Sequence, residues 1–489
     1  MTLSTALDVA RSGITVTSGQ TAVVSRNITG AEQALASRKI ANVVTGPGNG
    51  VRLASITRAS DNALLTQMLR ANAGAGQQRT ILDALQRLDS TVLDPELDVS
   101  PAALLGKLTD AIQLYSGAPH DAVAAQAAVA AAFDVARGLN SATETVQSLR
   151  QQADADIAST VERLNSLLAQ FETVNRAIVD GTRSGADVTD QLDNRDRLLV
   201  AISEEMGIRT ITRPDNDIAI FTDSGVTLFD TKARPITFER TLIYTPATVG
   251  NAVVVDGIQI TGGLGGMVIG SGRLAGLAAV RDELATAYQT QLDEIARGLI
   301  ETFAESDQSG GAALPDAPGL FTYAGATTVP ASGSVITGLA GLITINASVD
   351  PAQGGLVTRL RDGGIAGGPY TYNADGSASF SGRLQELVDQ MSAQRSFDGA
   401  AQLATAGTIG GFAASSVAWL QEARMTANAE ADYRTALFQR SSEALANTTG
   451  VNLDQEMTIL LDLERSYQAT SRLISVIDDM FRALLAAAG

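Results

Sequence analysis

Both ends of this chain carry apolar residues at heptad spacing, the pattern that packs one helix along another over a narrow stripe. Near the N-terminus successive apolar residues are alternately four and three positions apart. Near the C-terminus one set of apolar residues recurs every seven positions, and a second set lies three positions after members of the first. We expect these positions to form an assembly interface: Leu3, Leu7, Ile14, Val24, Ile28, Leu453, Leu460, Leu463, Tyr467, Ile474, Ile477, Phe481 and Leu484. Such seams at both ends are typical of a protein built to assemble.

The two ends are also opposite in charge. Residues 1–52 hold five basic and two acidic side chains, a net charge of +3, whereas residues 451–489 hold three basic and six acidic ones, a net charge of −3. The attraction is modest because exposed ion pairs are screened by salt. A pair of terminal helices with many Thr and Ala seam positions is marginal alone. We therefore expect it to gain stability by packing against copies of itself.

Composition excludes several classes of function. The net charge of −18 repels phosphate backbones and argues against nucleic-acid binding. Cysteine is absent and His120 is the single histidine, so thiol chemistry, disulfides and histidine-based metal sites have no residues to use. His120 follows Pro119 in a turn, and we interpret it as a surface residue. The sequence lacks an unbroken run of 18 apolar residues and an evident cleaved signal, so we expect no membrane span.

Periodicity along the chain predicts a mainly α fold: an elongated helical bundle with terminal coiled-coil helices and inserted β-rich segments, hence a multidomain α+β protein. Helical patterns cover 3–30, 58–92, 121–180, 189–205, 273–305, 381–447 and 452–487, and short β-branched runs lie between 208 and 260. The glycine-containing stretch 41–55 indicates a sharply turning loop. Gly74 and Gly76 are expected to weaken the middle of their helix.

This pattern predicts four units. The terminal assembly domain is 1–50 with 448–489, and the central bundle is 51–206 with 271–305 and 381–447. A β domain is inserted at 207–270, and a second, Gly- and Ala-rich insertion with weak β character occupies 306–380.

The motifs that could carry chemistry are weak. Gly270-x-Gly272-x-x-x-Gly276 opens a helix, but its spacing is wrong for a dinucleotide loop, and a glycine-rich linker explains it better. The acidic turns at 215–217 and Asp375 lack the closing glutamate of a calcium loop. The sequence therefore predicts no catalytic, cofactor-binding or metal site, and a protein that is not an enzyme.

Sequence blocks at both ends of the chain carry a recognisable signature. At the N-terminus they are Ala6-Leu7 to Ser12-Gly13-Ile14 and Ser25-Arg26-Asn27-Ile28. At the C-terminus they are Asn452-Leu453-Asp454, the block from Leu463 to Thr470, and residues 474–485. These blocks resemble the axial proteins of the bacterial flagellum, the family of rod, hook and hook-associated proteins. Internally, Leu192-Asp193-Asn194-Arg195-Asp196-Arg197-Leu198-Leu199 and the block from Gly272 to Leu277 are similar to the members that join hook and filament.

The resemblance implies a structural protein that assembles at the distal end of the hook as a ring of copies. It implies contact with the hook protein below, with a second junction protein above, and with a cytoplasmic export chaperone on the C-terminal helix. It also implies export through the flagellar type III channel without a cleaved signal, and terminal segments that are disordered in the monomer and fold on assembly.

Two other interpretations stay open at this stage. A hook or rod protein shares the termini, although its middle is β-dominated rather than helical. A secreted hydrolase or adhesin on a helical scaffold would use the 306–380 insertion as its active module, but that insertion has neither histidine nor cysteine.

Overall fold

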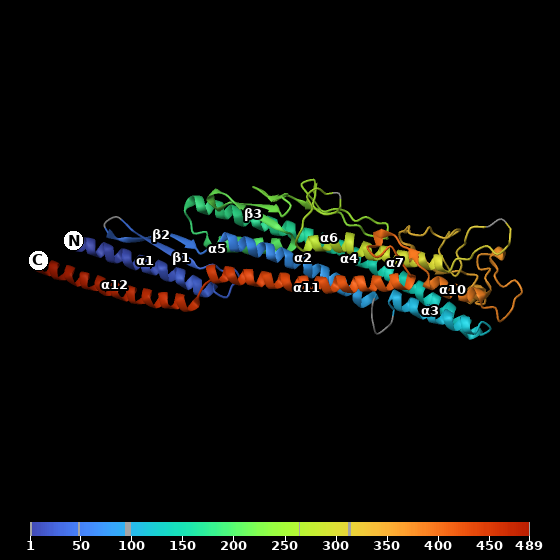
Figure 1. Cartoon of the computed structure of the whole chain (residues 1–489). Coiled ribbons are helices and arrows are strands. Elements are labelled where there is room, and N and C mark those ends of the chain that lie inside the picture. The colour runs from blue at the N-terminus through green and yellow to red at the C-terminus, as the bar shows by residue number, and fades with distance from the viewer. Residues whose placement is uncertain (1, 47–48, 93–98, 264, 312–313, 489) are drawn as a thin grey trace.

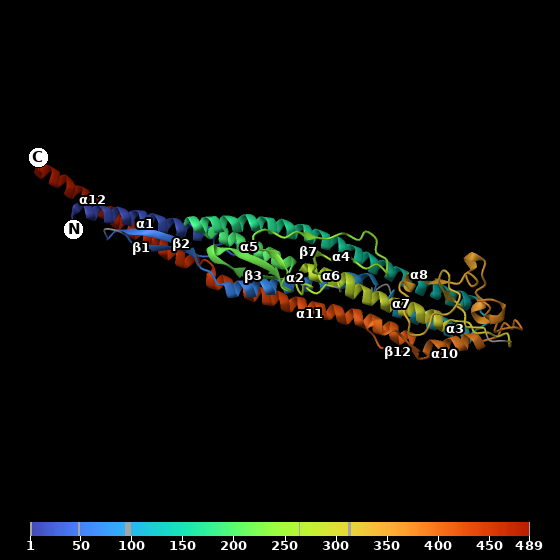
Figure 2. The ribbon, with the colours of Figure 1, turned by 90° about the horizontal axis from the view of Figure 1, so that it is seen from above.

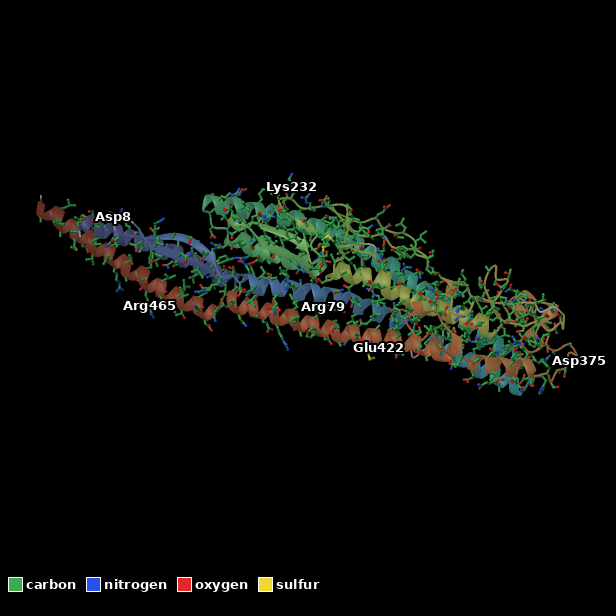
Figure 3. All side chains as sticks on the ribbon, turned by 45° about the horizontal axis from the view of Figure 1, so that its top comes forward. Asp8, Arg79, Lys232, Asp375, Glu422 and Arg465 are labelled. Atoms are coloured by element: carbon green, nitrogen blue, oxygen red, sulfur yellow. The ribbon has the colours of Figure 1, made fainter. Side chains whose placement is uncertain are left out.

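The computed structural model describes residues 2–46, 49–92, 99–263, 265–311 and 314–488. The protein is a long rod whose major helices run close to one common axis, and the two ends of the chain lie together at one tip (Figures 1 and 2). Asp375 marks the opposite tip in Figure 3. The predicted mainly α architecture is confirmed.

Helices make up most of the rod. In the described ranges the α-helices are α1 (Leu3–Gly30), α2 (Asn62–Val92), α3 (Pro101–Gly117), α4 (Ala122–Ser184), α5 (Thr189–Glu205), α6 (Arg273–Ala279), α7 (Ala285–Thr302), α8 (Leu339–Leu342), α9 (Arg359–Asp362), α10 (Gly382–Ser392), α11 (Ile409–Thr449) and α12 (Leu453–Ala488). The longest, α4, has 63 residues, about 95 Å at 1.5 Å per residue. The Asp121 side chain caps its first turn, and Gly185 ends it at a φ of 75°.

The strands are short and lie beside the helices. They are β1 (Lys39–Thr45), β2 (Val51–Arg58), β3 (Ile208–Thr212), β4 (Ile218–Thr222), β5 (Thr227–Phe229), β6 (Ile236–Thr237), β7 (Val254–Val255), β8 (Ile258–Gln259), β9 (Phe321–Thr322), β10 (Thr344–Ile345), β11 (Arg395–Ser396) and β12 (Ala406–Gly407). All pairings between these strands are antiparallel, in the sheet orders β1-β2, β3-β4-β5, β6-β7-β8, β10-β9 and β11-β12.

The bundle core forms where α2, α3, α4, α7 and α11 pack side by side. Alanines on α4, such as Ala128 and Ala132, are fully buried and let neighbouring helices approach closely. Tyr288 of α7 stacks on Trp419 of α11 with ring centroids 6.4 Å apart. By length and apolar composition α4 could cross a membrane, a test that the core helices of globular proteins also pass, and its alanine-rich face is packed into this core.

Glycines in the bundle serve close packing. We expected Gly74 and Gly76 to weaken α2, yet α2 is continuous and both glycines are buried. A Cβ atom at Gly76 would lie 2.6 Å from the carbonyl oxygen of Glu204, at the end of α5. One at Gly276 of α6 would lie 2.7 Å from the Gln77 carbonyl oxygen. Gly76 and Gly276 therefore let the end of α5 and α6 pack closely on α2.

The predicted strands between 208 and 260 are confirmed in place, and they cover the half of α4 that is nearer the termini. Ile220 and Leu228 are fully buried in this second core. Phe229 meets Phe171 of α4 edge to face at 5.0 Å. The acidic turn that could have suggested calcium is used structurally: Asp215 pairs with Arg183 at 2.8 Å.

Residues 306–380 are not detached from the bundle. Phe321 and Leu339 are fully buried in the same cluster as α7. The Asp293 carboxylate on α7 holds the backbone of this segment: it accepts hydrogen bonds from the amides of Gly338 and Ala340 at 2.8 and 2.9 Å. Whether the segment is a separate domain, like the rest of the predicted division, stays a prediction.

The single helix predicted for 381–447 is wrong, because α10 ends at Ser392 and α11 begins at Ile409. The intervening chain turns to reach α7. Arg297 donates to the Ser396 carbonyl oxygen at 2.6 Å, and the Asp398 amide donates to a Glu294 carboxylate oxygen at 2.9 Å. These partners lie about a hundred residues away, so helical periodicity alone does not show the break.

The loop predicted for 41–55 is also wrong in part. β1 and β2 form a hairpin on either side of the turn, with a bulge between Asn42 and Val43. Pro47 and Gly48, which we placed in the turn, lie outside the described residues.

Candidate assembly interface: the terminal helix pair and its clamp

The two terminal helices pack along each other, as the heptad seams predicted, and extend past the end of the bundle (Figures 1 and 2). On α1, Ala10 and Val24 are buried, and on α12 Ile477 is buried. A Cβ atom on Gly13 would lie 3.4 Å from the Thr470 methyl group, so small residues on α1 set a close approach. Among the described residues, α12 packs along α1 as a narrow two-helix seam.

The predicted interface residues fall into two groups. Val24 and Ile477 are buried in the chain itself. The partly buried ones are Leu3, Leu7, Ile14, Ile28, Leu460, Leu463, Ile474 and Phe481. Leu453, Tyr467 and Leu484 remain 46%, 45% and 54% exposed. The structure therefore joins the two rows to each other, and their role between subunits stays a prediction.

A second face of α1, which we did not predict, carries the β1–β2 hairpin. Val16 and Val23 on this face are buried, at a seven-residue spacing. The Ser12 hydroxyl accepts a hydrogen bond from the Val51 amide at 3.0 Å. Leu53 lies against Gly19. Because the hairpin covers one side of α1 and α12 the other, α1 is the buried centre of a three-part terminal unit.

The base of this unit is held by a buried polar knot. The Asn27 side chain donates to the Lys39 carbonyl oxygen at 2.9 Å and to the Glu456 carboxylate at 3.0 Å, and it accepts from the Lys39 amide at 2.9 Å. Glu456 also accepts from the Arg38 guanidinium at 2.6 Å. Asn27 and Glu456 are 2% and 1% exposed. The knot thus joins α1, β1 and α12 with their hydrogen bonds satisfied.

An acidic ladder then clamps this unit to the bundle. Four aspartates recur every third residue at the start of α5, and they face cations from α1, β1 and β2. The ion pairs are Arg26–Asp187 at 2.7 Å, Arg26–Asp190 at 2.8 Å, Lys39–Asp190 at 2.9 Å, Lys39–Asp193 at 3.2 Å, Arg58–Asp193 at 2.9 Å and Arg58–Asp196 at 2.7 Å. Asp193 also accepts from the Ser37 hydroxyl at 2.5 Å. We call Asp187, Asp190, Asp193 and Asp196 the clamp.

The pKa of each clamp carboxyl depends on how deeply it is buried and on the cations beside it. Burial alone would raise the pKa of Asp187 and of Asp190, but hydrogen bonds and charge from Arg26, with Lys39 at Asp190, bring both pKa values below the ordinary range. Burial raises the pKa of Asp196, although Arg58 and Arg195 oppose it. Asp193 and Lys39 are both almost fully buried, so this central pair is the expensive one to break.

The clamp gives a structural role to the internal block 192–199, which resembles members of the family that join hook and filament. Asp193 and Asp196 of that block face the terminal unit. Arg195 turns the other way: it donates to Asn175 at 3.2 Å and to the Asn216 carbonyl oxygen, and burial lowers the pKa of Arg195 to about 10. Leu198 and Leu199 pack in the core under the β strands. One helix therefore links the terminal unit, the bundle and the β segment.

The clamp was missed from the sequence, although a signal existed. In Asp-x-x-Asp-x-x-Asp-x-x-Asp each carboxylate is a neighbour of the next on the helix surface, so that like charges repel unless cations lie between them. Matching cations at 26, 39 and 58 lie far away in the chain, so the pairing appears only in the fold.

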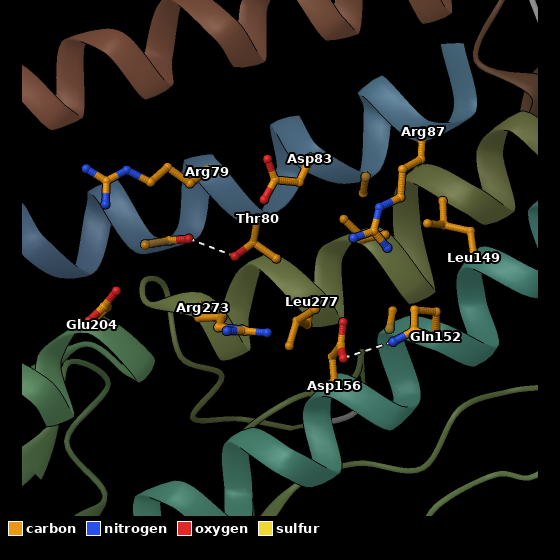
Figure 4. Close-up of a pocket in the computed structure, with 14 residues that line it drawn as sticks. Arg79, Thr80, Asp83, Arg87, Leu149, Gln152, Asp156, Glu204, Arg273 and Leu277 are labelled. Atoms are coloured by element: carbon orange, nitrogen blue, oxygen red, sulfur yellow. Dashed lines mark hydrogen bonds between the residues drawn. The ribbon is translucent and has the colours of Figure 1, made fainter. Parts of the chain in front are cut away.

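The structure offers little for chemistry. Figure 4 shows a cleft of about 210 Å³ between α2, α4 and α6, lined by Arg79, Asp83, Arg87, Asp156 and Arg273, among others. Its charges alternate in sign and no nucleophile is paired with a base. In the described residues no group of three His, Cys, Asp or Glu is placed to hold a metal ion. His120 is exposed in the turn between α3 and α4.

Replacing Asp193 by Asn is expected to loosen the clamp. Lys39 and Arg58 would face an amide in a buried site, which costs about 3 kcal/mol for a broken buried pair. Amide hydrogen exchange in β1 and β2 of the assembled protein should speed up by about a hundredfold. Asp187→Asn is the matched control, since its carboxylate is partly exposed and Arg26 keeps Asp190, so its cost should stay below about 1 kcal/mol. Equal exchange in both variants would contradict this role for Asp193.

Comparisons with known proteins agree with this architecture. Residues 85–319 match the flagellar hook-associated protein FlgK helical domain, and residues 443–487 match the C-terminal family of flagellar basal body rod FlgEFG proteins. Flagellar hook-associated protein 1 of Bacillus subtilis is 22% identical over 459 residues, covering 88% of this chain and 85% of the relative. That of Salmonella typhimurium is 23% identical, covering 54% of this chain and 51% of the relative.

The fold itself has a solved counterpart. The flagellar hook junction protein FlgK from Burkholderia pseudomallei superposes with a TM-score of 0.57 at 14% identity, covering 78% of this chain and 99% of the other. The matched families and relatives are structural proteins of the flagellar axis. Within that class, the chain is similar to flagellar hook-associated protein 1, in its helical domain and over most of its length.

Proposed function

We propose that this protein is a structural component of the bacterial flagellum that assembles at the distal end of the hook, where it forms the junction on which the filament is built. The observation that carries the proposal is the terminal unit: α1, α12 and the hairpin, clamped to a helical body by α5. It serves packing between subunits and holds no reacting groups, which agrees with relatives that are structural flagellar proteins.

The proposed partners follow from the same unit. Copies of this chain pack side by side through the terminal helices, the hook protein lies below, and a second hook–filament junction protein lies above. A cytoplasmic export chaperone covers α12 before export, because α12 carries more exposed large hydrophobic side chains than any other described helix. The protein leaves the cell through the flagellar type III channel and resides in the extracellular flagellum. No nucleic acid and no cofactor take part.

We further propose that the terminal segments are disordered in the free chain and fold on assembly. A two-helix seam buries little on α12, where large apolar side chains stay open to solvent. Folding of the α1–α12 pair then depends on contacts with neighbouring subunits. Only at the growing tip do these contacts offset the conformational entropy that the terminal segments lose when they fold.

Deleting the gene in its source organism is expected to leave hooks without filaments. Filament subunits would still be exported, but they would find no junction and would appear in the medium as soluble flagellin. Electron microscopy of the cell surface and immunoblotting of the medium measure both effects, and the gene on a plasmid is the control. Normal filaments on the mutant would contradict the proposed function.

A further inference from the structure

The largest concentration of exposed apolar side chains lies on α12. Nine large hydrophobic residues of this one helix are between 45% and 74% exposed. They are Leu453, Met457, Leu461, Tyr467, Leu473, Val476, Met480, Leu484 and Leu485. Arg465, labelled in Figure 3, points into solvent on the side of α12 away from α1. A helix this apolar on its outer surface is made to be covered.

These residues do not form one stripe. The buried and partly buried positions of α12, such as Glu456, Leu463, Thr470 and Ile477, recur at heptad spacing and face α1. At 3.5 residues per turn, Met457 and Leu461 lie about 100° to one side of that seam. Leu473, Val476 and Met480 lie about 100° to the other side. We call the first pair the proximal flank and the other three the distal flank.

We propose that the proximal flank of one copy packs against the distal flank of the next copy. The inference rests on the proposed function and names the contact that it requires. The centres of the two flanks are about 17 residues apart, so parallel α12 helices of neighbouring copies are staggered by about 26 Å along their length at 1.5 Å per residue. A contact between two different surfaces with an axial shift builds a helical row of copies and not a flat closed ring.

Polar residues on the same two sides support the stagger. Without an axial shift, the distal flank would lie against the side chains at the same height on the other side of α12, which are Ser471, Ser475 and Asp478. Burying leucine and valine against a carboxylate is unfavourable, because the charge would lose its water. The shift by about 17 residues replaces Ser471 and Ser475 with Met457 and Leu461, and the one carboxylate on that side, Glu464, comes to the edge of the contact beside Met480.

Charge gives an independent match. Asp454 borders the proximal flank and Arg472 borders the distal flank, each on the solvent side of α12 away from α1, and both are exposed. They are 18 positions apart, which is close to the stagger. In neighbouring copies the Asp454 carboxylate therefore comes opposite the Arg472 guanidinium, whereas in one chain the two groups are too far apart to meet.

Cysteine cross-linking tests the contact without background, because the chain has no cysteine. The full-length double variant Leu461→Cys/Met480→Cys is assembled on hooks in the cell and oxidised. We expect a ladder of disulfide-linked dimers, trimers and larger species. Each single variant should give less than a tenth of this cross-linking, because Leu461 of one copy meets the distal flank and not another Leu461.

A matched control places the second cysteine on the same side of α12 but at a different position along the helix axis. Leu461→Cys/Ser466→Cys places its second thiol on the distal side of α12, but with a separation of five residues. A ladder from this control, or efficient dimers from single variants, would overturn the staggered contact. Assembly with filaments but without cross-links in the first double variant would overturn it too, and would leave the junction function standing.

A charge exchange covers the case in which the cysteine variants fail to assemble. Asp454→Arg and Arg472→Asp should each reduce filament formation, and the double variant should restore it at least tenfold over either single variant. Absence of restoration would overturn the contact. Failure of the unmodified chain to support filaments would instead overturn the proposed function.

Discussion

Removing residues 452–489 is expected to abolish assembly while the rod stays folded. In the structure α12 packs mainly on α1, and its one buried polar link to the rest is Glu456, through Asn27 and Arg38. The two apolar clusters of the body contain no residue of α12. The deletion should therefore destabilise the terminal unit and leave the helical body beyond the clamp folded.

The measurement combines two readouts. Far-UV circular dichroism and thermal unfolding of the purified variant should show a body that melts within a few degrees of the full chain, whereas cells carrying only the variant should have hooks without filaments. A variant that lacks only residues 487–489 is the control, since these lie beyond the clamp and the proposed flanks. Filaments built on the truncated chain would show that α12 is dispensable for the junction.

The seams and the long helices could be predicted because their information is local. Leu460, Ile474 and Ile477 repeat at heptad spacing, and a helix with that pattern needs a partner along its length. The strand runs of 208–260 are similarly local, since turn residues separate them. For these elements the periodicity of the sequence is enough to fix the class of structure.

The clamp and the hairpin depend on pairs of distant residues, and no local pattern specifies them. Asp193 alone indicates a solvated helix start, and Lys39 alone indicates a surface strand. Only the fold buries them together at 3.2 Å. In the hairpin, a bulge and the glycine-rich turn hide the alternation that normally predicts strands. The break before α11 has the same origin, because Glu294 and Arg297 of α7 reorganise a segment that is helical in pattern.

A single buried carboxylate in the body, Asp154 of α4, is expected to control the stability of the long loop beyond β6. Asp154 is fully buried and pairs with the fully buried Arg281 at 2.7 Å. It also accepts from the Tyr244 hydroxyl at 2.7 Å and from the Thr241 amide at 2.9 Å. Burial, together with the hydrogen bond to Asp154, raises the pKa of Tyr244 to about 12. Arg281 in turn holds the Asn251 carbonyl oxygen at 2.8 Å.

Asp154→Ala should lower the free energy of unfolding by about 3–5 kcal/mol, because the Thr241 amide, the Tyr244 hydroxyl and one side of the buried Arg281 guanidinium lose their acceptor. Urea unfolding measures the total, and hydrogen exchange at residues 241–251 should show the loop opening first. Asp156→Ala on the same helix is the matched control. Asp156 is partly exposed and accepts one bond from Gln152, so its loss should cost less than about 0.5 kcal/mol.

The double variant Asp154→Ala/Arg281→Met separates charge from packing. Arg281 keeps its ion pair with Asp282 in Asp154→Ala, but it loses the carboxylate that faced its other side. Replacing the guanidinium with an apolar side chain should therefore return part of the lost stability, because a buried pair replaced by apolar groups is often close to neutral. The Thr241 amide and the Tyr244 hydroxyl still lack an acceptor, so recovery should be incomplete. If the double variant were as unstable as Asp154→Ala alone, the loss of the Asp154–Arg281 pair would not be the source of the instability, and the loop hydrogen bonds would account for it instead.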